Sequence, residues 1–520
     1  MSLWTRSLGG MLSGAASVAF KTGLNLLVIP ILIGHLGLDV FGLYLLLLAI
    51  LELVTLLNLG LGNALISLLG NHATSSKERR EYLAVGHVVF LGLSALVLVS
   101  GLALSASFPE RFHIQPGLAE MARTSFLLMI VEAVILLYSS YNHAILLSHC
   151  AHQWSNLADT LYYFIANLGG LLLLLAGGDL TAVMMARLVG VVMRQGMMIF
   201  YAWRLEPFAF RHGFALVPRS CKELFSLGGH AIVLNISIIL SHKIDDLVIA
   251  RFLPLSAVGL FEIVFRLLGI IIQVALKLSE GAFPLFARFR AEQNRPNAKL
   301  LFLRMSSFLN IVSSLIILGI VCHYSELLRL FSAHRISPEV TWPVLLTAIP
   351  CLLSGVLQMP ANALLFNWGH RRFLTVTSLI AAVSNVVLSL ILVQQFGVVG
   401  VALGTLIPQL IQHQAGLVRR ACVELGISAG SYLKQVHGAL IIPLAVSYLW
   451  IQLFAPWVHS QGQADRWILL PILFACGGGF FLGLALWFAR TASLQERELF
   501  AKYVWTPLQN RYSTLKRASG

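Results

Sequence analysis

The sequence predicts an all-α polytopic membrane protein with about fourteen transmembrane helices. Of its 520 residues, 58% are hydrophobic and only 11% are charged, and the mean hydropathy is +0.83. Soluble domains have roughly 25% charged residues, so this chain lacks the polar side chains to cover a surface in water. Apolar runs long enough to cross a hydrocarbon core of about 30 Å recur along the whole length. The protein surface is therefore expected to face lipid.

The expected spans follow one another with short connections. The first run continues through Lys21 to about Ile33, which favours an uncleaved span over a signal peptide. Asn58, inside the second run, is expected to hydrogen-bond to a neighbouring helix. The spans are expected at 8–34, 41–69, 83–106, 123–148, 157–177, 180–203, 226–253, 257–285, 301–323, 341–366, 373–394, 398–418, 436–456 and 467–489.

Basic residues alternate between the connections. One set of connections is rich in Lys and Arg, with clusters near residues 77–80, 204–222, 288–299, 371–372 and 419–434. The other set has little beyond Arg111, Arg329, Arg335 and Arg466. Because positive charge collects on the cytoplasmic side, both termini are expected in the cytoplasm and the number of spans is expected to be even.

Several functional classes are disfavoured. The net charge of +14 arises from these short clusters, so nucleic-acid binding is not expected. The six cysteines have neither disulfide nor metal spacing, and no Walker motif is present, so no metal, ATP or other cofactor is expected. The expected external loops near 107–120, 324–339 and 457–466 are short, which disfavours an enzyme such as a polysaccharide polymerase or ligase. No catalytic residue is assigned.

Two stretches of the chain suggest an internal repeat. The segment Ile33–Tyr44 is similar to Ala250–Phe261, with Gly42 aligned on Gly259 at an offset of 217 residues (259 − 42 = 217). Asn167 aligns with Asn385 at a nearly equal offset of 218 (385 − 167 = 218). A duplicated unit of about six spans gives two lobes of the same orientation around a central cavity. Chance similarity between Leu- and Gly-rich helices is the alternative.

The repeat and the charge pattern together predict the domain organisation. It comprises an N-terminal six-helix lobe (1–203), a cytoplasmic linker (204–225) and a second six-helix lobe (226–418). Two further transmembrane helices (419–489) and a basic cytoplasmic tail (490–520) follow.

Ionisable residues inside the spans are candidate functional groups, because burying each of them costs about 2.5 kcal/mol or more. They are concentrated in the first eight spans. Charged residues near the middle of a span are expected to line a polar cavity. Arg194, Arg251, Lys277 and Glu280 lie nearer to span ends, and they are expected to form structural ion pairs or to reach the membrane interface. Asp246 and Arg266 lie at similar depth in a helical hairpin, so an ion pair between them is reasonable. The candidate cavity cations are Lys21, Arg187, Lys243 and Arg266, and the candidate ion-coupling or cavity acids are Glu52, Glu132, Asp245 and Asp246.

Several stretches resemble the polysaccharide transporters of the multidrug/oligosaccharidyl-lipid/polysaccharide exporter superfamily, which includes the O-antigen (Wzx-type) flippases. These are Leu36–Tyr44, Leu59–Gly62, Asp245–Leu253 leading to Val258–Leu260, Phe283–Leu285 and Phe396–Gly400. Pro254 departs from the pattern, since a glycine is commoner there. The resemblance implies a MATE-like pair of six-helix lobes, alternating access and a cationic cavity. It matches Lys21, Lys243 and Arg266 to the family's basic cavity positions and Asp246 to its acidic one.

The resemblance implies translocation of an undecaprenyl-diphosphate-linked oligosaccharide, an O-antigen or exopolysaccharide repeat unit, across the bacterial inner membrane. Coupling to H⁺ or Na⁺ is expected, and a polysaccharide polymerase and chain-length proteins are possible partners besides membrane lipids. A lipid II flippase and a multidrug exporter of the same superfamily are the alternatives. A multidrug exporter is disfavoured because cationic drugs require a net acidic cavity.

Overall fold

The computed structural model describes residues 24, 28–58, 60–70, 76–149, 151–207, 217–226, 244–280, 282–460, 472, 475–484 and 486–487. Within these ranges the secondary structure is helical and no strand occurs. Ten of the described helices are long and apolar enough to cross a membrane. The predicted all-α polytopic class is thus confirmed. The count of about fourteen spans stays a prediction, because parts of the expected spans at 8–34, 226–253 and 467–489 lie outside the described residues.

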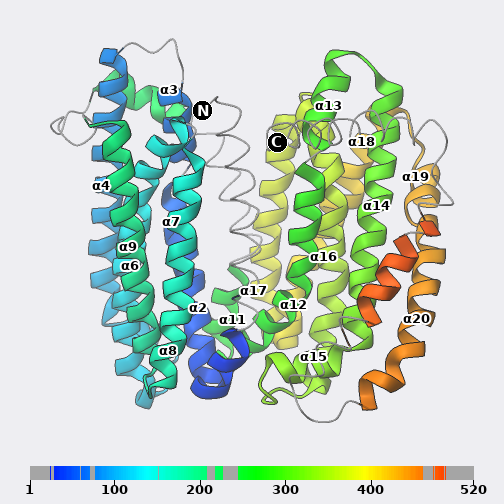
Figure 1. The fold of residues 1–520 in the computed structure, drawn as a ribbon, viewed down its shortest axis with the longest axis horizontal. Coiled ribbons are helices and arrows are strands. Elements are labelled where there is room, and N and C mark those ends of the chain that lie inside the picture. The colour runs from blue at the N-terminus through cyan, green and yellow to red at the C-terminus, as the bar shows by residue number, and fades with distance from the viewer. Residues whose placement is uncertain are drawn as a thin grey trace, which may run out of the picture. The chain divides into compact units, whose positions relative to one another are not determined.

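The described chain consists of helices joined by connections (Figure 1). Most of these helices begin and end close to the predicted bounds. Residues 28–36 are also helical. The longer elements are α2 Leu38–Thr55, α3 Leu61–Gly70, α4 Ser76–Ser105, α6 Ala119–Ser148, α7 His152–Phe164, α9 Leu180–Leu205, α11 Ile244–Phe252, α12 Leu255–Glu280, α13 Ala282–Ala291, α14 Arg295–Cys322, α15 Tyr324–Phe331, α16 Pro338–Asn367, α17 Arg371–Leu410, α19 Ala429–Val436 and α20 Ile441–Ser460. Shorter ones are α5 Phe108–Arg111, α8 Gly170–Leu175 and α18 Arg419–Leu425, with π-helical turns at Ile165–Gly169 and Ile411–Val418.

The chain forms two compact units. The first comprises the described residues within 1–269, 325–354 and 369–417. In this unit α6 packs against α2, α3, α4 and α9, while α7 lies against α9 (Figure 1). α11 packs against both α2 and α17. Large side chains such as Phe41, Phe90 and Tyr141 are fully buried between these helices.

The second unit comprises the described residues within 270–324, 355–368 and 418–520. Here α14 packs against α13, α18, α19 and α20. The Asn310 side-chain amide donates a 3.1 Å hydrogen bond to the Val436 carbonyl, and the Phe302 and Tyr432 rings stack with centroids 5.6 Å apart. The units are defined by packing, and the division into lobes 1–203 and 226–418, linker 204–225, helices 419–489 and tail 490–520 stays a prediction.

The outer faces of the helices are apolar, as lipid contact requires. On α4, Leu96, Val99 and Leu102 are 60%, 66% and 54% exposed. Their spacing of three residues places them on one side of the helix. A water-soluble protein rarely exposes such a continuous apolar stripe, so this face fits the hydrocarbon of a bilayer.

Two glycines interrupt helices where the backbone leaves the helical region. Gly397 has φ +56° and ψ −133° inside α17, at the turn predicted between the spans 373–394 and 398–418. Gly60, with φ +70°, separates α2 from α3 within a run that the sequence predicts as one span. Asn58 Oδ1 accepts a 2.9 Å hydrogen bond from the Gly62 amide, which satisfies one free N–H group in the first turn of α3. This local bond differs from the interhelical one that was expected.

Two glycines that the predicted repeat aligns lie at one helix crossing of the first unit. A Cβ placed on Gly42 of α2 would lie 1.9 Å from the Leu255 carbonyl oxygen of α12. A Cβ placed on Gly259 of α12 would lie 3.6 Å from the Leu38 carbonyl oxygen of α2. Leu38 and Leu255, like Gly42 and Gly259, are 217 residues apart (255 − 38 = 217). Reciprocal contacts of this kind are what a twofold axis produces, so the crossing supports the predicted repeat.

Candidate functional site

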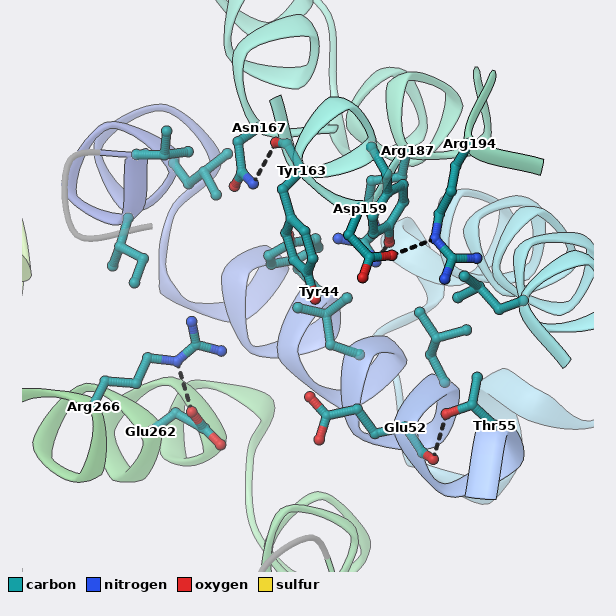
Figure 2. A pocket seen from close by; sticks show the side chains of 17 residues that line it. Tyr44, Glu52, Thr55, Asp159, Tyr163, Asn167, Arg187, Arg194, Glu262 and Arg266 are labelled. Atoms are coloured by element: carbon teal, nitrogen blue, oxygen red, sulfur yellow. Dashed lines mark hydrogen bonds and ion pairs between the residues drawn. The ribbon is translucent and has the colours of Figure 1, made fainter. Parts of the chain in front are cut away.

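A cavity of about 600 Å³ lies within the first unit, between α2, α7, α9 and α12 (Figure 2). Its polar lining comprises Tyr44, Glu52, Thr55, Asp159, Tyr162, Tyr163, Asn167, Arg187, Arg194, Glu262 and Arg266. These helices are expected to span the membrane, so each charged side chain must find a partner or water within the bundle. The structure shows a close carboxylate partner for each lining arginine.

Arg187 forms the most deeply buried of these ion pairs. Its Nη2 atom lies 2.7 Å from Glu132 Oε1, and its Nε atom donates to Oε2 at 3.2 Å. The Tyr162 hydroxyl donates to the same carboxylate and accepts a 2.7 Å hydrogen bond from Arg187 Nη2. Glu132 is fully buried and Arg187 is 7% exposed. Both carboxylate oxygens are therefore occupied, as a buried pair requires.

Arg194 and Asp159 form a second pair across α9 and α7. Arg194 Nε lies 2.7 Å from Asp159 Oδ1, and its Nη1 donates to the Ser139 hydroxyl at 2.5 Å. The Asp159 side chain is 26% exposed, so this pair is more open than the pair formed by Glu132. Arg194 lies seven residues, about two helical turns, beyond Arg187 (194 − 187 = 7), which places both arginines on one face of α9.

Arg266 and Glu262 form a third pair along α12. Arg266 Nε lies 2.7 Å from Glu262 Oε2, one helical turn earlier on the same helix. The Arg266 side chain is 31% exposed and Glu262 is 13% exposed. Figure 2 shows this pair on one side of the cavity, with Glu52 of α2 beside it. An Asp246–Arg266 pair stays a prediction, and the partner that the structure gives Arg266 is Glu262, one helical turn away.

The described lining is balanced in charge. Three arginines face three carboxylates, namely those of Glu52, Asp159 and Glu262. The sequence predicted a cationic cavity, but two of its expected cations, Lys21 and Lys243, lie outside the described residues. An excess of positive charge therefore depends on those two lysines.

A second buried polar cluster surrounds Asp245, where α11 packs against α17. Asp245 is 3% exposed, and its Oδ2 atom accepts a 2.7 Å hydrogen bond from the Thr405 hydroxyl. The Asn385 amide donates to Thr405 Oγ1 at 3.0 Å, and the Ser389 hydroxyl donates to Asn385 Oδ1 at 3.3 Å. Asp245 Oδ1 is buried without a hydrogen-bond partner among the described residues. A buried carboxylate oxygen in this state is suited to a proton or a cation.

The structure brings together Glu52, Arg187 and Arg266 at the cavity, with Glu132 directly behind Arg187. Asp245 belongs to the second cluster, and Asp246, which is 2% exposed, is its neighbour on α11. The sequence interpretation missed the contributions of Asp159, Tyr162 and Thr405. Asp159 lies near the start of its span and was not counted among the intramembrane charges, while hydroxyl groups give no signal in a search for charge.

Comparison with known proteins identifies relatives at the level of family and fold. A family model described as polysaccharide biosynthesis protein matches residues 7–290, which is more than half of the chain. A structure of the lipid II flippase MurJ in an inward closed conformation has a TM-score of 0.64 at 16% identity, covering 92% of this chain and 98% of that chain. No curated protein matches the sequence.

Two multidrug-type structures share the fold. An inward-facing multidrug resistance MATE family transporter of the MOP superfamily has a TM-score of 0.64 at 14% identity, covering 78% of this chain and 94% of that chain. A MOP superfamily transporter from Pyrococcus furiosus has a TM-score of 0.54 at 14% identity, covering 82% and 98%. At these identities the likeness shows the fold alone. The predicted MATE-like fold is thereby confirmed.

Proposed function

The chain belongs to the polysaccharide biosynthesis protein family, and on this premise we propose that it is a flippase for an undecaprenyl-diphosphate-linked oligosaccharide. The cargo is an O-antigen or exopolysaccharide repeat unit, moved across the bacterial inner membrane by alternating access. The observation that supports this most directly is the cavity with Arg187, Arg194 and Arg266 in its lining.

The depth of the cavity suits such a cargo. Arg266 lies eleven residues after the start of α12 at Leu255, which is about 16 Å along the helix. This distance is close to half of a hydrocarbon core of about 30 Å. A diphosphate cannot cross hydrocarbon without a large desolvation cost, and guanidinium groups at mid-depth bind phosphates by charge-assisted hydrogen bonds. The prenyl chain can remain in lipid while the polar headgroup crosses.

Transport by purified protein tests this proposal. Proteoliposomes are loaded with a fluorescent undecaprenyl-diphosphate disaccharide, and flipping is measured by loss of fluorescence to an external quencher. The variants Arg194→Ala and Arg266→Ala should reduce the rate by about tenfold or more, because a charge-assisted contact contributes about 1.5–3 kcal/mol. The matched control is Arg288→Ala, which removes an exposed arginine from a similar i,i+4 pair with Glu292.

The same assay distinguishes the alternatives. Faster flipping of lipid II than of the disaccharide cargo would favour a lipid II flippase. Equal rates for the variants and the wild-type protein would contradict the role of the cavity arginines. Efflux of a cationic dye without flipping of the disaccharide cargo would favour a multidrug exporter.

We further propose that Asp245 binds the coupling ion, H⁺ or Na⁺. Its Oδ1 atom, which has no hydrogen-bond partner among the described residues, and the Thr405 hydroxyl bonded to Oδ2 provide oxygen ligands at one buried position. Oxygen ligands suit hard cations, and the carboxylate alone suits a proton. Asp246 on the same helix is a second candidate acid. The cluster joins α11 to both sides of the Gly397 turn, so binding an ion there would fix these segments relative to one another.

Imposed gradients test the coupling. In wild-type proteoliposomes, flipping should accelerate under either a pH gradient or a Na⁺ gradient, and the effective gradient identifies the ion. Asp245→Asn should abolish that acceleration, while Glu292→Gln, which alters an exposed carboxylate, should retain it. Acceleration that persists in both Asp245→Asn and Asp246→Asn would exclude these acids as coupling sites.

A further inference from the structure

The reciprocal crossing of α2 and α12 separates two cavities of the first unit. On one side lies the arginine-lined cavity, whose lining begins at Tyr44 on α2 and at Glu262 on α12. On the other side lies a second pocket of about 550 Å³, lined by Asp39 and by residues 253–255. Gly42 and Gly259 fall between these two sets of residues on their respective helices. The crossing is therefore the partition between the two cavities.

The partition is dry and closely packed. Phe41, Leu43 and Val258 are each fully buried beside the two glycines. The backbones touch, since a Cβ on Gly42 would lie 1.9 Å from the Leu255 carbonyl oxygen and 2.6 Å from its carbonyl carbon. No water-filled path fits through such a contact.

The second pocket, here called the vestibule, has both polar and apolar side chains in its lining. Beyond Asp39 it is lined by His113, Gln115 and Arg251, and Arg251 Nη1 lies 3.4 Å from His113 Nδ1. It lies where α2 begins, where α11 ends and where α4 connects to α6. The distribution of basic residues predicts that all of these connections are external. The vestibule is therefore expected to open to the extracytoplasmic side.

We infer that the α2–α12 crossing is the extracytoplasmic gate of the cavity, and that the two helices separate at Gly42 when the cavity opens outward. This inference uses the alternating access of the proposed function, but it holds for any cargo. The closed gate requires a glycine at position 42. It does not require one at 259, where a Cβ would meet only ordinary contacts, 3.5 Å from Phe41 Cδ1 and 3.6 Å from the Leu38 oxygen.

The two repeat-related glycines provide a matched pair of variants. In Gly42→Ala, the new methyl group must move about 1.5 Å or more from the Leu255 oxygen to reach a normal contact distance, which separates the helices. Gly259→Ala makes the same chemical change at the equivalent position without that collision. Gly42→Ala is therefore expected to favour the outward-open state, and Gly259→Ala is expected to leave the gate closed.

Cysteine accessibility measures the state of the gate without any cargo. In a background with the six native cysteines replaced by serine, Leu48→Cys places one thiol in the cavity lining. A membrane-impermeant maleimide added from the external side should label it about tenfold faster in Gly42→Ala than in the parent, and at the parental rate in Gly259→Ala. Equal labelling in all three proteins would overturn the inference, and so would equal acceleration by both glycine variants.

A cross-link provides a test that does not depend on the folding of Gly42→Ala. The Leu38 Cδ2 atom lies 4.0 Å from a Cβ at position 259, so Leu38→Cys with Gly259→Cys can be joined by a short cross-linker. The joined protein should lose flipping at least tenfold, and a cleavable linker should restore the rate when cut. Undiminished flipping by the joined protein would overturn the gate. Failure of every protein to flip the cargo would contradict the proposed function, whereas the labelling result would still decide the gate.

Discussion

At the scale of single residues, Glu132 and Arg187 form the most deeply buried ion pair of the cavity. Their pair is bidentate, includes Tyr162 and is almost completely shielded from solvent. In the pair formed by Arg194 and Asp159 the carboxylate is the more exposed member, at 26% against 0% for Glu132, whereas the two arginine side chains are 12% and 9% exposed. The sequence interpretation placed Glu132 among the candidate coupling acids and Arg187 among the cavity cations. The geometry favours a structural contribution of this pair to the cavity wall.

Removing one partner of this buried pair should destabilise the protein more than removing both. Glu132→Gln leaves the Arg187 charge without a counter-ion, at a cost of about 3–5 kcal/mol. The double variant Glu132→Gln with Arg187→Met should recover much of that loss, because no unpaired charge remains. Thermal unfolding in detergent, followed for both single variants and the double variant, measures the coupling. Additive losses would contradict a direct ion pair.

Glu206, at the end of α9, provides a prediction on pH. Burial acts to raise the pKa of this carboxyl, but hydrogen bonds from His149 and Arg79 outweigh it, so the pKa lies below its ordinary value. Arg79 Nε lies 2.5 Å from Glu206 Oε1 and its Nη1 donates to the Leu69 carbonyl, which ties α4 to the ends of α3 and α9.

A carboxyl whose pKa is depressed by folding stabilises the native state above its unfolded pKa, and this stabilisation is lost as the pH falls through the folded pKa. Glu206→Gln should therefore lower the melting temperature at pH 7, and its difference from the wild-type protein should shrink as the pH falls below about 4.5. Melting curves of both proteins from pH 8 to about pH 3 measure this. Glu110→Gln, in α5, is a control. A difference independent of pH would contradict the electrostatic origin.

At the scale of elements, the spans of uniform apolar sequence were predicted well. α6, α14 and α16 begin and end within a few residues of the bounds expected at 123–148, 301–323 and 341–366. Helix interruptions were predicted less well. The break at Gly60 lies inside an uninterrupted apolar run, and hydropathy alone contains no signal for a left-handed residue there.

Gly397 allows a test of whether such a helix break requires a residue that tolerates positive φ, because a side chain there would not collide with other atoms. A Cβ at Gly397 would meet nothing within 4 Å, yet its φ of +56° is unfavourable for residues with a side chain. Gly397→Ala should therefore cost about 1–3 kcal/mol through backbone strain. Gly92→Ala, in α4, also meets nothing within 4 Å but has ordinary helical geometry, and should be neutral or stabilising. Equal effects of the two variants on the melting temperature would contradict this account.

At the scale of the whole molecule, the chain is a multi-pass membrane protein with the fold of MOP-type transporters. Its orientation remains a prediction from the alternation of basic connections. In a cysteine-free background, Arg111→Cys should react with an impermeant maleimide in intact spheroplasts, and Arg372→Cys should react only after permeabilisation. Labelling of Arg372→Cys in intact spheroplasts would place both termini outside, and would also reverse the assignment of the gate at Gly42.

The sequence by itself determined the membrane class, the approximate span positions and the concentration of ionisable groups in the first eight spans. These properties follow from hydrophobic transfer, which depends on the residues of one segment at a time. Only the tertiary structure decided which charges meet. Arg187 and Glu132 are separated by 55 residues, and Asp245 and Thr405 by 160. A buried charge is stabilised by whichever partner the packing brings within about 3 Å, and that distance depends on the arrangement of several helices rather than on any one of them.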